Sequence, residues 1–399
     1  MTDTLFTNLR AADQTPVSVL CRDGRIAATG PGPATAIAAG APVQNVIDGG
    51  GRLLMPAFVE PHVHLDKTLW GEPWRAGFSA ARLMDYIQNE RSVLSACETP
   101  ISVRAGRLLE RMLCLGTTAI RSHIDVAPDM GLSHVAAMLA LRTDWSDRID
   151  LQFVAFPQQG LLIRPGTLDL LAEAVGMGVE CVGGLDPAGI DGGPDGQLRA
   201  IFGLAERTGA GIDIHLHDKG ELGAWQVGRI CDFVEASGLQ GRAMISHAYC
   251  LGMISDAALN RLGRRLADLR ISLMTSAPAD VPVPPVAALT DMGVVVCCGS
   301  DGIRDAWSPL GNGDLLERAF LTAFRFDWAT EAQLALALAC ATHHAARAIG
   351  LPGYGLAVGD RADFLMVDAE TPGDALARRP RERRVVRAGR LVADDGRLV

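Results

Sequence analysis

The sequence repeats one pattern along most of its length: a short apolar run followed at once by a polar residue of the kind that binds metals or substrates. After a longer first step the repeat is about 30 residues, the length of a strand, a helix and two loops. Helical stretches such as LDLLAEAVGMG lie between the runs. The pattern predicts an α/β protein with a (β/α)8 barrel, in which reactive groups gather at the carboxyl ends of the strands. The polar residues that follow the eight runs are His62 with His64, His123, Gln158, Asp186, His215, His247, Ser276 and Asp301.

Both ends of the chain depart from this pattern. Residues 1–56 and 348–399 contain short β-like runs separated by turn signals such as Asp23-Gly24. We expect these ends to form one small β-sandwich domain beside a barrel of residues 57–347. A chain of 399 residues, 48% of them hydrophobic, is long and apolar enough for a large barrel and a minor domain.

Composition restricts the classes of partner. A net charge of −9 disfavours nucleic acid or an anionic membrane as a partner. No apolar run is long enough to span a bilayer, and the first residues lack the apolar core of a secretory signal. Nine cysteines without a C-x-x-C pair fit a reducing compartment. We therefore expect a cytoplasmic protein that acts on a small molecule, and the acidic, apolar-rich barrel is compatible with a homo-oligomer.

The segment LLMPAFVEPHVHLDK holds two histidines at a spacing of two. Leu53 to Val59 is predicted as a buried strand, with His62 and His64 just past it. Residues two apart on a strand point to the same side, so the two imidazoles can form half of a metal site. Taken alone, the pair can equally be two polar residues at the entry of a loop.

The other polar residues at the barrel mouth complete the metal hypothesis. His215, His247 and Asp301 should meet His62 and His64 there, with His123 and Gln158 nearby. Imidazoles with a carboxylate suit Zn²⁺ or Fe²⁺, or else Mn²⁺, with a position left for water. Such an ion lowers the pKa of bound water to about 7. The chain has only two lysines, Lys67 and Lys219, so a carboxylated-lysine bridge between two ions cannot form and we expect one ion.

The long first step contains KTLWGEPWRAGFSAARLMDYIQNERSVL. We expect it to cross the barrel mouth, either as a lid carrying Trp70 and Trp74 or as ordinary loop packing. Asp66, which precedes it, is expected to be a structural acid near Lys67. His134, in a later helical run, is expected at the surface or in a cap.

Several segments resemble the amidohydrolase superfamily and, within it, the cytosine deaminase-like branch. They are MPAFVEPHVHLDKT, RSHIDV, LQFVAFPQQG, VGGLDPA, IDIHLHDKGE, ISHAYC and GSDGIRDAWSPLGNGD. The resemblance implies a metal-dependent hydrolase whose ion is held by His62, His64, His215 and Asp301. It places His247 beside the activated water and Gln158 at the substrate ring. Lys67 and Trp307 are further predicted substrate-binding residues, with a structural cation as the alternative for Lys67.

The chain also departs from the cytosine deaminase pattern. Those enzymes carry a glutamate proton shuttle three residues after the histidine of the fifth strand, where this chain has Asp218, one methylene shorter. Gly302 stands where they have a second aspartate, and Lys67 stands where they have threonine. Asp218 is therefore the predicted shuttle, and His217 is a second group that can face the site. The motifs therefore support membership of the superfamily more strongly than they support cytosine as the substrate.

The function implied is cleavage of an exocyclic C–N bond on a nitrogen heterocycle. Asp301 is expected to accept the proton of the water, and His247 is expected to stabilise the oxyanion. The leaving group is ammonia, as in deamination of cytosine or a pterin, or an alkylamine, as in N-dealkylation of an aminotriazine. One alternative is a hydrolase that opens a cyclic amide such as a lactam or hydantoin. A non-catalytic barrel with a structural ion is disfavoured, because a structural zinc site is closed by protein ligands and needs no extra acid.

Overall fold

The structure is a computed structural model that describes residues 3–31, 43 and 45–399. Its centre is a sheet of eight parallel strands in sequence order from β5 to β12. The two outer strands of this sheet meet, because Val63 bridges Asp301 and the Asp301 N–H donates to the His62 carbonyl at 2.9 Å. The predicted barrel is thereby confirmed. Its strands are β5 (Phe58–Val63), β6 (Thr117–Asp125), β7 (Asp150–Phe156), β8 (Cys181–Leu185), β9 (Gly211–Leu216), β10 (Ala243–His247), β11 (Ser272–Thr275) and β12 (Val296–Cys298).

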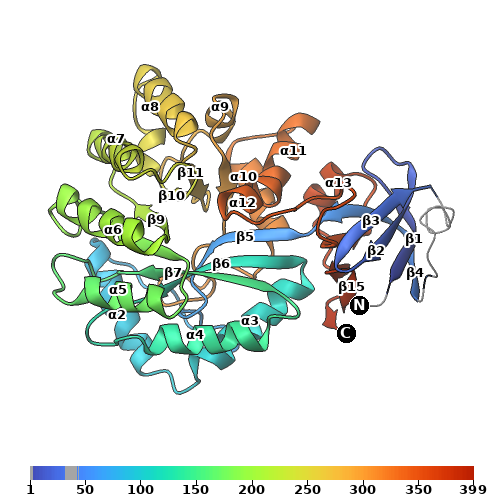
Figure 1. Ribbon diagram of the computed structural model, residues 1–399, viewed down its shortest axis with the longest axis horizontal. Coiled ribbons are helices and arrows are strands. Elements are labelled where there is room, and N and C mark those ends of the chain that lie inside the picture. Colours follow the sequence, from blue (N-terminus) through green and yellow to red (C-terminus); the bar gives the residue numbers. More distant parts are fainter. Residues whose placement is uncertain (1–2, 32–42, 44) are drawn as a thin grey trace.

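Helices surround the barrel strands (Figure 1). In α8, for example, Leu259, Leu262 and Leu266 recur at helical spacing and are buried, and the helix begins at Ser255, whose hydroxyl accepts from the Ala258 N–H. The helices between the barrel strands are α2 (Leu83–Ser95), α3 (Ile101–Cys114), α4 (Ser133–Asp144), α5 (Thr167–Gly176), α6 (Pro194–Thr208), α7 (Gly220–Ala236), the short 3-10 helix η1 (Tyr249–Gly252), α8 (Asp256–Asp268) and α9 (Val286–Asp291). After β12 follow α10 (Leu315–Arg325), α11 (Glu331–Cys340) and α12 (His343–Ala348).

The prediction of one strand from Leu53 to Val59 was wrong in one respect, because this segment contributes to two strands in two different sheets. β4 (Asn45–Pro56) belongs to the sheet of the chain ends, whereas β5 starts at Phe58 in the barrel. The chain changes sheets at Ala57, whose N–H donates to the Asp363 carbonyl, while the Phe58 N–H donates to the Gly116 carbonyl. His62 therefore lies within β5, and the barrel ladder rather than a loop fixes its backbone.

The two chain ends form a separate mixed sheet of eight strands, seen at the right of Figure 1 with both termini. Phe6 of β1 and Ile26 of β3 share one buried core with Phe364 of β13 and Val386 of β14, although β3 and β14 are far apart in the sheet order. The sheet is therefore curled around its own core. Its elements are β1 (Thr4–Arg10), β2 (Pro16–Arg22), β3 (Arg25–Gly30), β4, β13 (Phe364–Val367), β14 (Arg383–Arg387), β15 (Arg390–Asp394) and β16 (Arg397–Leu398), with α13 (Pro372–Arg378) between β13 and β14.

The long first excursion packs over the barrel mouth through α2. Ile87 on this helix is buried against Phe156 and Leu185, which end two barrel strands. Trp70 is partly buried against the main core, whereas Trp74 is 72% exposed. The helix, more than the tryptophans, is therefore what covers the mouth.

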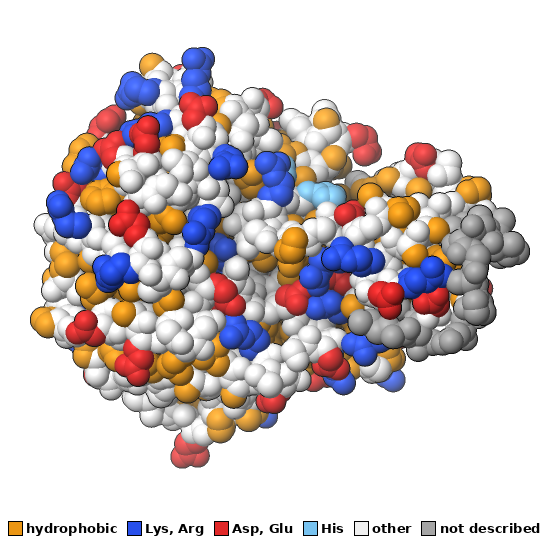
Figure 2. All heavy atoms as spheres, in the orientation of Figure 1, with side chains coloured by type: hydrophobic (Ala, Val, Ile, Leu, Met, Phe, Trp, Pro, Cys, Tyr) orange, Lys and Arg blue, Asp and Glu red, His pale blue; other side chains and the backbone are white. Residues whose placement is uncertain are grey.

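The surface of the described residues carries both signs of charge. On the face shown in Figure 2, acidic and basic side chains are interspersed over both the barrel and the small domain. None of the helices in the described part of the chain combines the length and the apolar character that crossing a membrane requires.

Candidate metal centre and active site

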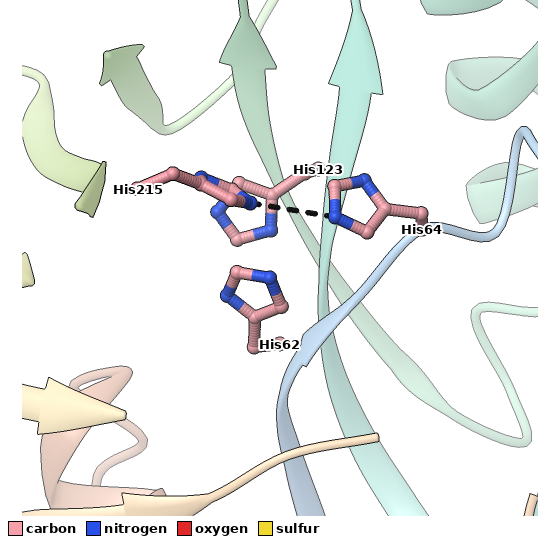
Figure 3. A group of neighbouring side chains, drawn as sticks. All are labelled: His62, His64, His123 and His215. Carbon is pink, nitrogen blue, oxygen red and sulfur yellow. Dashed lines mark hydrogen bonds between the residues drawn. The ribbon is translucent and has the colours of Figure 1, made fainter. Parts of the chain in front are cut away.

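Four histidines meet at the carboxyl end of the barrel and form what we call the imidazole cluster: His62, His64, His123 and His215. One ring nitrogen from each lies within 4.8 Å of those of the other three. Figure 3 shows the four rings turned toward a common space, although they come from three different strand ends. Asp301 borders this space, with its Oδ1 3.4 Å from His64 Nε2 and 3.6 Å from His62 Nε2.

The spacing of these atoms fits one metal ion. His64 Nε2 and His215 Nε2 are 3.4 Å apart. Two nitrogens bound to one zinc ion at about 2.0–2.1 Å lie about 3.4 Å apart in a tetrahedral site. His62 Nε2 is buried and has no hydrogen-bond partner among the described residues. A cation would bring these lone pairs and the carboxylate together favourably, so the donor set fits a divalent ion.

The protonation of the cluster suits metal binding. Burial, together with the nearby Lys67 ammonium, lowers the pKa of His64 to about 4. Burial and the neighbouring imidazoles hold the pKa of His215 well below its usual value. Burial raises the pKa of Asp301, but the imidazoles of His247 and His62 outweigh it and hold that pKa well below the usual range. His64 and His215 are therefore neutral imidazoles beside a carboxylate.

A second layer of residues orients the His62 ring. Ser246 Oγ donates to Asp213 Oδ1 at 2.9 Å, so at 2.8 Å it can only accept from the N–H at His62 Nδ1. His62 Nε2 is left as the lone pair that faces the cluster. Asp213 also lies 3.2 Å from Arg121 Nη1 and 3.5 Å from His123 Nε2, which ties His123 to the same layer.

Sequence reasoning missed Asp213 and Ser246. The available signal was a charged residue inside the buried run GIDI, two residues before His215 and so on the same face of β9. A buried charge in a strand needs a partner, and here the partners come from β6 and β10.

The backbone bends sharply at two of the predicted residues. His247 and Asp301 have φ angles of +73° and +61°, a left-handed conformation that residues other than glycine rarely adopt. Such conformations cluster at functional sites, where they aim a side chain. His247 Nδ1 lies 3.3 Å from the Tyr249 hydroxyl, and His247 Nε2 is buried without a hydrogen-bond partner among the described residues.

A cavity of about 520 Å³ opens over the cluster. Its volume is typical of sites for small molecules. The predicted residues that line it are His64, Lys67, Gln158, His215, His247, Asp301 and Trp307. His62 lies beneath them and is fully buried.

Apart from the buried His62, Asp218 is the predicted site residue that does not line this cavity. Its carboxylate accepts from the Gly189 N–H at 3.0 Å and from Gln226 Nε2 at 2.8 Å. His217 lines the cavity instead, with its Nδ1 2.8 Å from Asp186 Oδ2. Burial lowers the pKa of His217, but Asp186 outweighs this and raises it above the usual value. His217 is thus the titratable group that this loop presents to the cavity.

A second buried group, the lysine cluster, lies beside the cavity and consists of Lys67, Glu90, Asp125 and Gln158. Lys67 Nζ lies 2.7 Å from Asp125 Oδ1 and 3.5 Å from Glu90 Oε1, and it donates to Gln158 Oε1. Burial lowers the pKa of Lys67, but Asp125 and Glu90 outweigh it and raise that pKa above its usual value. The cluster therefore carries its own cation.

Asp66 is a buried structural acid near Lys67, as predicted, whereas His134 differs from expectation. Asp66 pairs with His134, whose Nδ1 is 2.8 Å from Asp66 Oδ2. The side chain of His134 is only 13% exposed, so the prediction of a surface or capping residue was wrong. The reason is that α4 packs against the end of β6, where Asp66 also accepts from the Asp125 N–H.

Comparison with known proteins agrees with this site. The model of the amidohydrolase family matches residues 110–399. The N-isopropylammelide isopropyl amidohydrolase of Pseudomonas sp. (strain ADP) is 29% identical over 368 residues, which are 90% of each chain. The crystal structure of N-isopropylammelide isopropylaminohydrolase from Burkholderia multivorans ATCC 17616 is 42% identical, with a TM-score of 0.95 over 100% of both chains. That of 5-methylcytosine deaminase from Klebsiella pneumoniae is 28% identical, with a TM-score of 0.84 over 98% of both.

These matches confirm the resemblance that the motifs predicted. The family match spans most of the barrel together with the carboxyl-terminal part of the small domain. The chain therefore belongs to the amidohydrolase family, whose members are metal-dependent hydrolases of carbon–nitrogen bonds.

Proposed function

We propose that this chain releases an amine from a nitrogen heterocycle by hydrolysing an exocyclic C–N bond. The observation that carries the proposal is the convergence of the imidazole cluster and Asp301 at the floor of a cavity that suits a substituted ring. His62, His64, His215 and Asp301 would hold one divalent ion, which when bound supplies an activated water as the nucleophile.

The chain's own residues handle the proton and the oxyanion. Asp301, kept ionised by the imidazoles around it, is placed to take the proton of the attacking water. His247 has a free buried nitrogen with which to stabilise the oxygen that forms at the attacked ring carbon. Asp218 remains the predicted proton shuttle, and a proton from it would reach the ring through His217, which lines the cavity.

Three side chains are proposed to bind the ring. Gln158 and Lys67 line one wall of the cavity, and Trp307 lines it beside Tyr86, with 5.3 Å between the two ring centroids. Trp307 Nε1 is a buried donor without a partner among the described residues, so it can donate to a polar atom of the substrate.

An alkylamine is our first choice of leaving group, and ammonia is the second. The choice is supported by 42% identity to an N-isopropylammelide enzyme over the whole chain, against 28% to a 5-methylcytosine deaminase. The test is to incubate the purified, metal-loaded protein with N-isopropylammelide and with 5-methylcytosine and to quantify isopropylamine and ammonia. Release of neither amine contradicts the proposal, and a product heavier by one water with no amine released would indicate ring opening.

The identity of the metal, the location, the oligomeric state and the domain limits are also proposals. We propose Zn²⁺ or Fe²⁺, and less readily Mn²⁺, as the ion, a cytoplasmic location and a homo-oligomer. We also propose domain limits of 1–56 with 348–399 and of 57–347, with the terminal sheet packed as a β-sandwich. The shared core of β3 and β14 supports the sandwich.

A further inference from the structure

Glu90 is a buried carboxylate that the predicted mechanism does not use. It lies on α2, within the long excursion, and is only 2% exposed. Its Oε1 accepts from Gln158 Nε2 at 2.7 Å and lies 3.5 Å from Lys67 Nζ. Lys67 in turn donates to Gln158 Oε1, so the three side chains form a closed triangle of contacts.

The triangle fixes which way the Gln158 amide faces. Its oxygen must point to the ammonium, because an ammonium only donates, and this leaves the amide nitrogen to donate to Glu90 Oε1. Without Glu90 the buried Gln158 nitrogen would lack this partner, and the amide would be held only through its oxygen. Lys67 would stay in place, since Asp125 holds it at the shorter distance of 2.7 Å.

Glu90 also stands between two cavities. It lines the cavity above the imidazole cluster, and it lines a second cavity of about 780 Å³ together with Asp125 and His134. Its side chain therefore forms part of the walls of both cavities, so a variant at this position should keep a side chain of similar size.

We infer that Glu90 is a positioning residue, which acts through Gln158 by setting its amide for the heterocycle. The inference rests on the proposed function, because Gln158 is assigned there to the substrate ring. It gives the long excursion a part in recognition, since the excursion supplies the group that orders a side chain of β7's end.

The test is a double-mutant cycle with variants that keep the two cavities apart. Glu90→Leu removes the acceptor, whereas Glu90→Gln keeps an acceptor of the same size that cannot ionise. We expect Glu90→Leu to lower kcat/KM by about 10- to 100-fold, Glu90→Gln to recover most of that loss, and Glu90→Leu with Gln158→Ala to be no worse than Gln158→Ala alone. Gln88→Leu, at an exposed position of the same helix, is the matched control and should match the wild type.

Losses that multiply in the double variant, or no loss in Glu90→Leu, would overturn the inference. A second readout needs no turnover: in crystals, the Gln158 amide should rotate or become disordered in Glu90→Leu and keep its place in Glu90→Gln. If the wild-type protein releases no amine from N-isopropylammelide or 5-methylcytosine, the proposed function fails. The orientation of Gln158 in the Glu90→Leu crystals then still decides the role of Glu90, and an unchanged amide would refute it.

Discussion

Two buried polar groups lie at the mouth of one barrel, and their charges are balanced in different ways. The imidazole cluster with Asp301 offers converging lone pairs and a carboxylate, a donor set that suits a divalent ion. The lysine cluster surrounds an ammonium that the chain itself provides. The first group therefore suits an added metal ion, whereas the second already contains a positive charge. Changes to the two groups should have separable effects on activity and stability.

The largest expected effect is on the imidazole side. Asp301→Asn should lower kcat by about 10³-fold or more, because it removes a charged ligand and the acceptor of the water proton. Its melting temperature, measured on the metal-free protein, should stay near that of the wild type, since the lysine cluster is untouched. The exposed Asp144→Asn serves as control, and a rate for Asp301→Asn above a tenth of wild type would break the comparison.

On the lysine side, the dominant effect should be on stability. Lys67→Met leaves Glu90 and Asp125 buried without their cation, and we expect the free energy of unfolding to fall by ~3–5 kcal/mol. Lys219→Met changes the only other lysine, which is exposed at the start of α7, and should cost within ~0.5 kcal/mol. Urea denaturation measures both. An equal decrease in the free energy of unfolding of the two variants would mean that Lys67 stabilises the fold no more than an exposed lysine does.

A smaller effect should appear in the pH dependence of stability. Burial, only partly offset by Lys67, raises the pKa of Glu90 to about 8, whereas an unfolded glutamate titrates near pH 4.5. The folded state therefore holds an extra proton between about pH 4.5 and 8, and its stability falls as the pH rises through that window, by at most ~1.4 kcal/mol per pH unit.

Glutamine at this position cannot titrate. The free energy of unfolding of Glu90→Gln minus that of the wild type should therefore increase from pH 5 to pH 8, because only the wild type loses stability as Glu90 ionises. Denaturation curves of both proteins at several pH values test this, and a constant difference across that range would show that Glu90 does not titrate there.

The metal side of the site could be predicted from sequence because each residue follows its own apolar run. His62, His215 and His247 lie at the carboxyl ends of strands and Asp301 follows β12, and the closed barrel brings these ends together whatever lies between them. The boundary at Ala57 could not be predicted, because β4 and β5 read as one apolar segment and their separation depends on hydrogen bonds to the distant Asp363 and Gly116.

The lysine cluster and the loop after β9 were less predictable, because their side-chain positions also depend on contacts between distant parts of the chain. Glu90 lies on a helix outside the repeat, and its burial depends on contacts with β7 that no local pattern reports. Asp218 holds the expected position in the motif, but the direction of its side chain depends on Asp186, which accepts from the N–H groups of His217 and Asp218 and turns the loop.

The most direct test of the account is a calorimetric titration of the metal-free protein with Zn²⁺, repeated on His215→Gln. The account predicts one tightly bound ion per chain in the wild type and binding weaker by at least about tenfold in the variant. Absence of binding, two tight ions, or equal affinity in the variant would contradict the claim that His62, His64, His215 and Asp301 form one metal site.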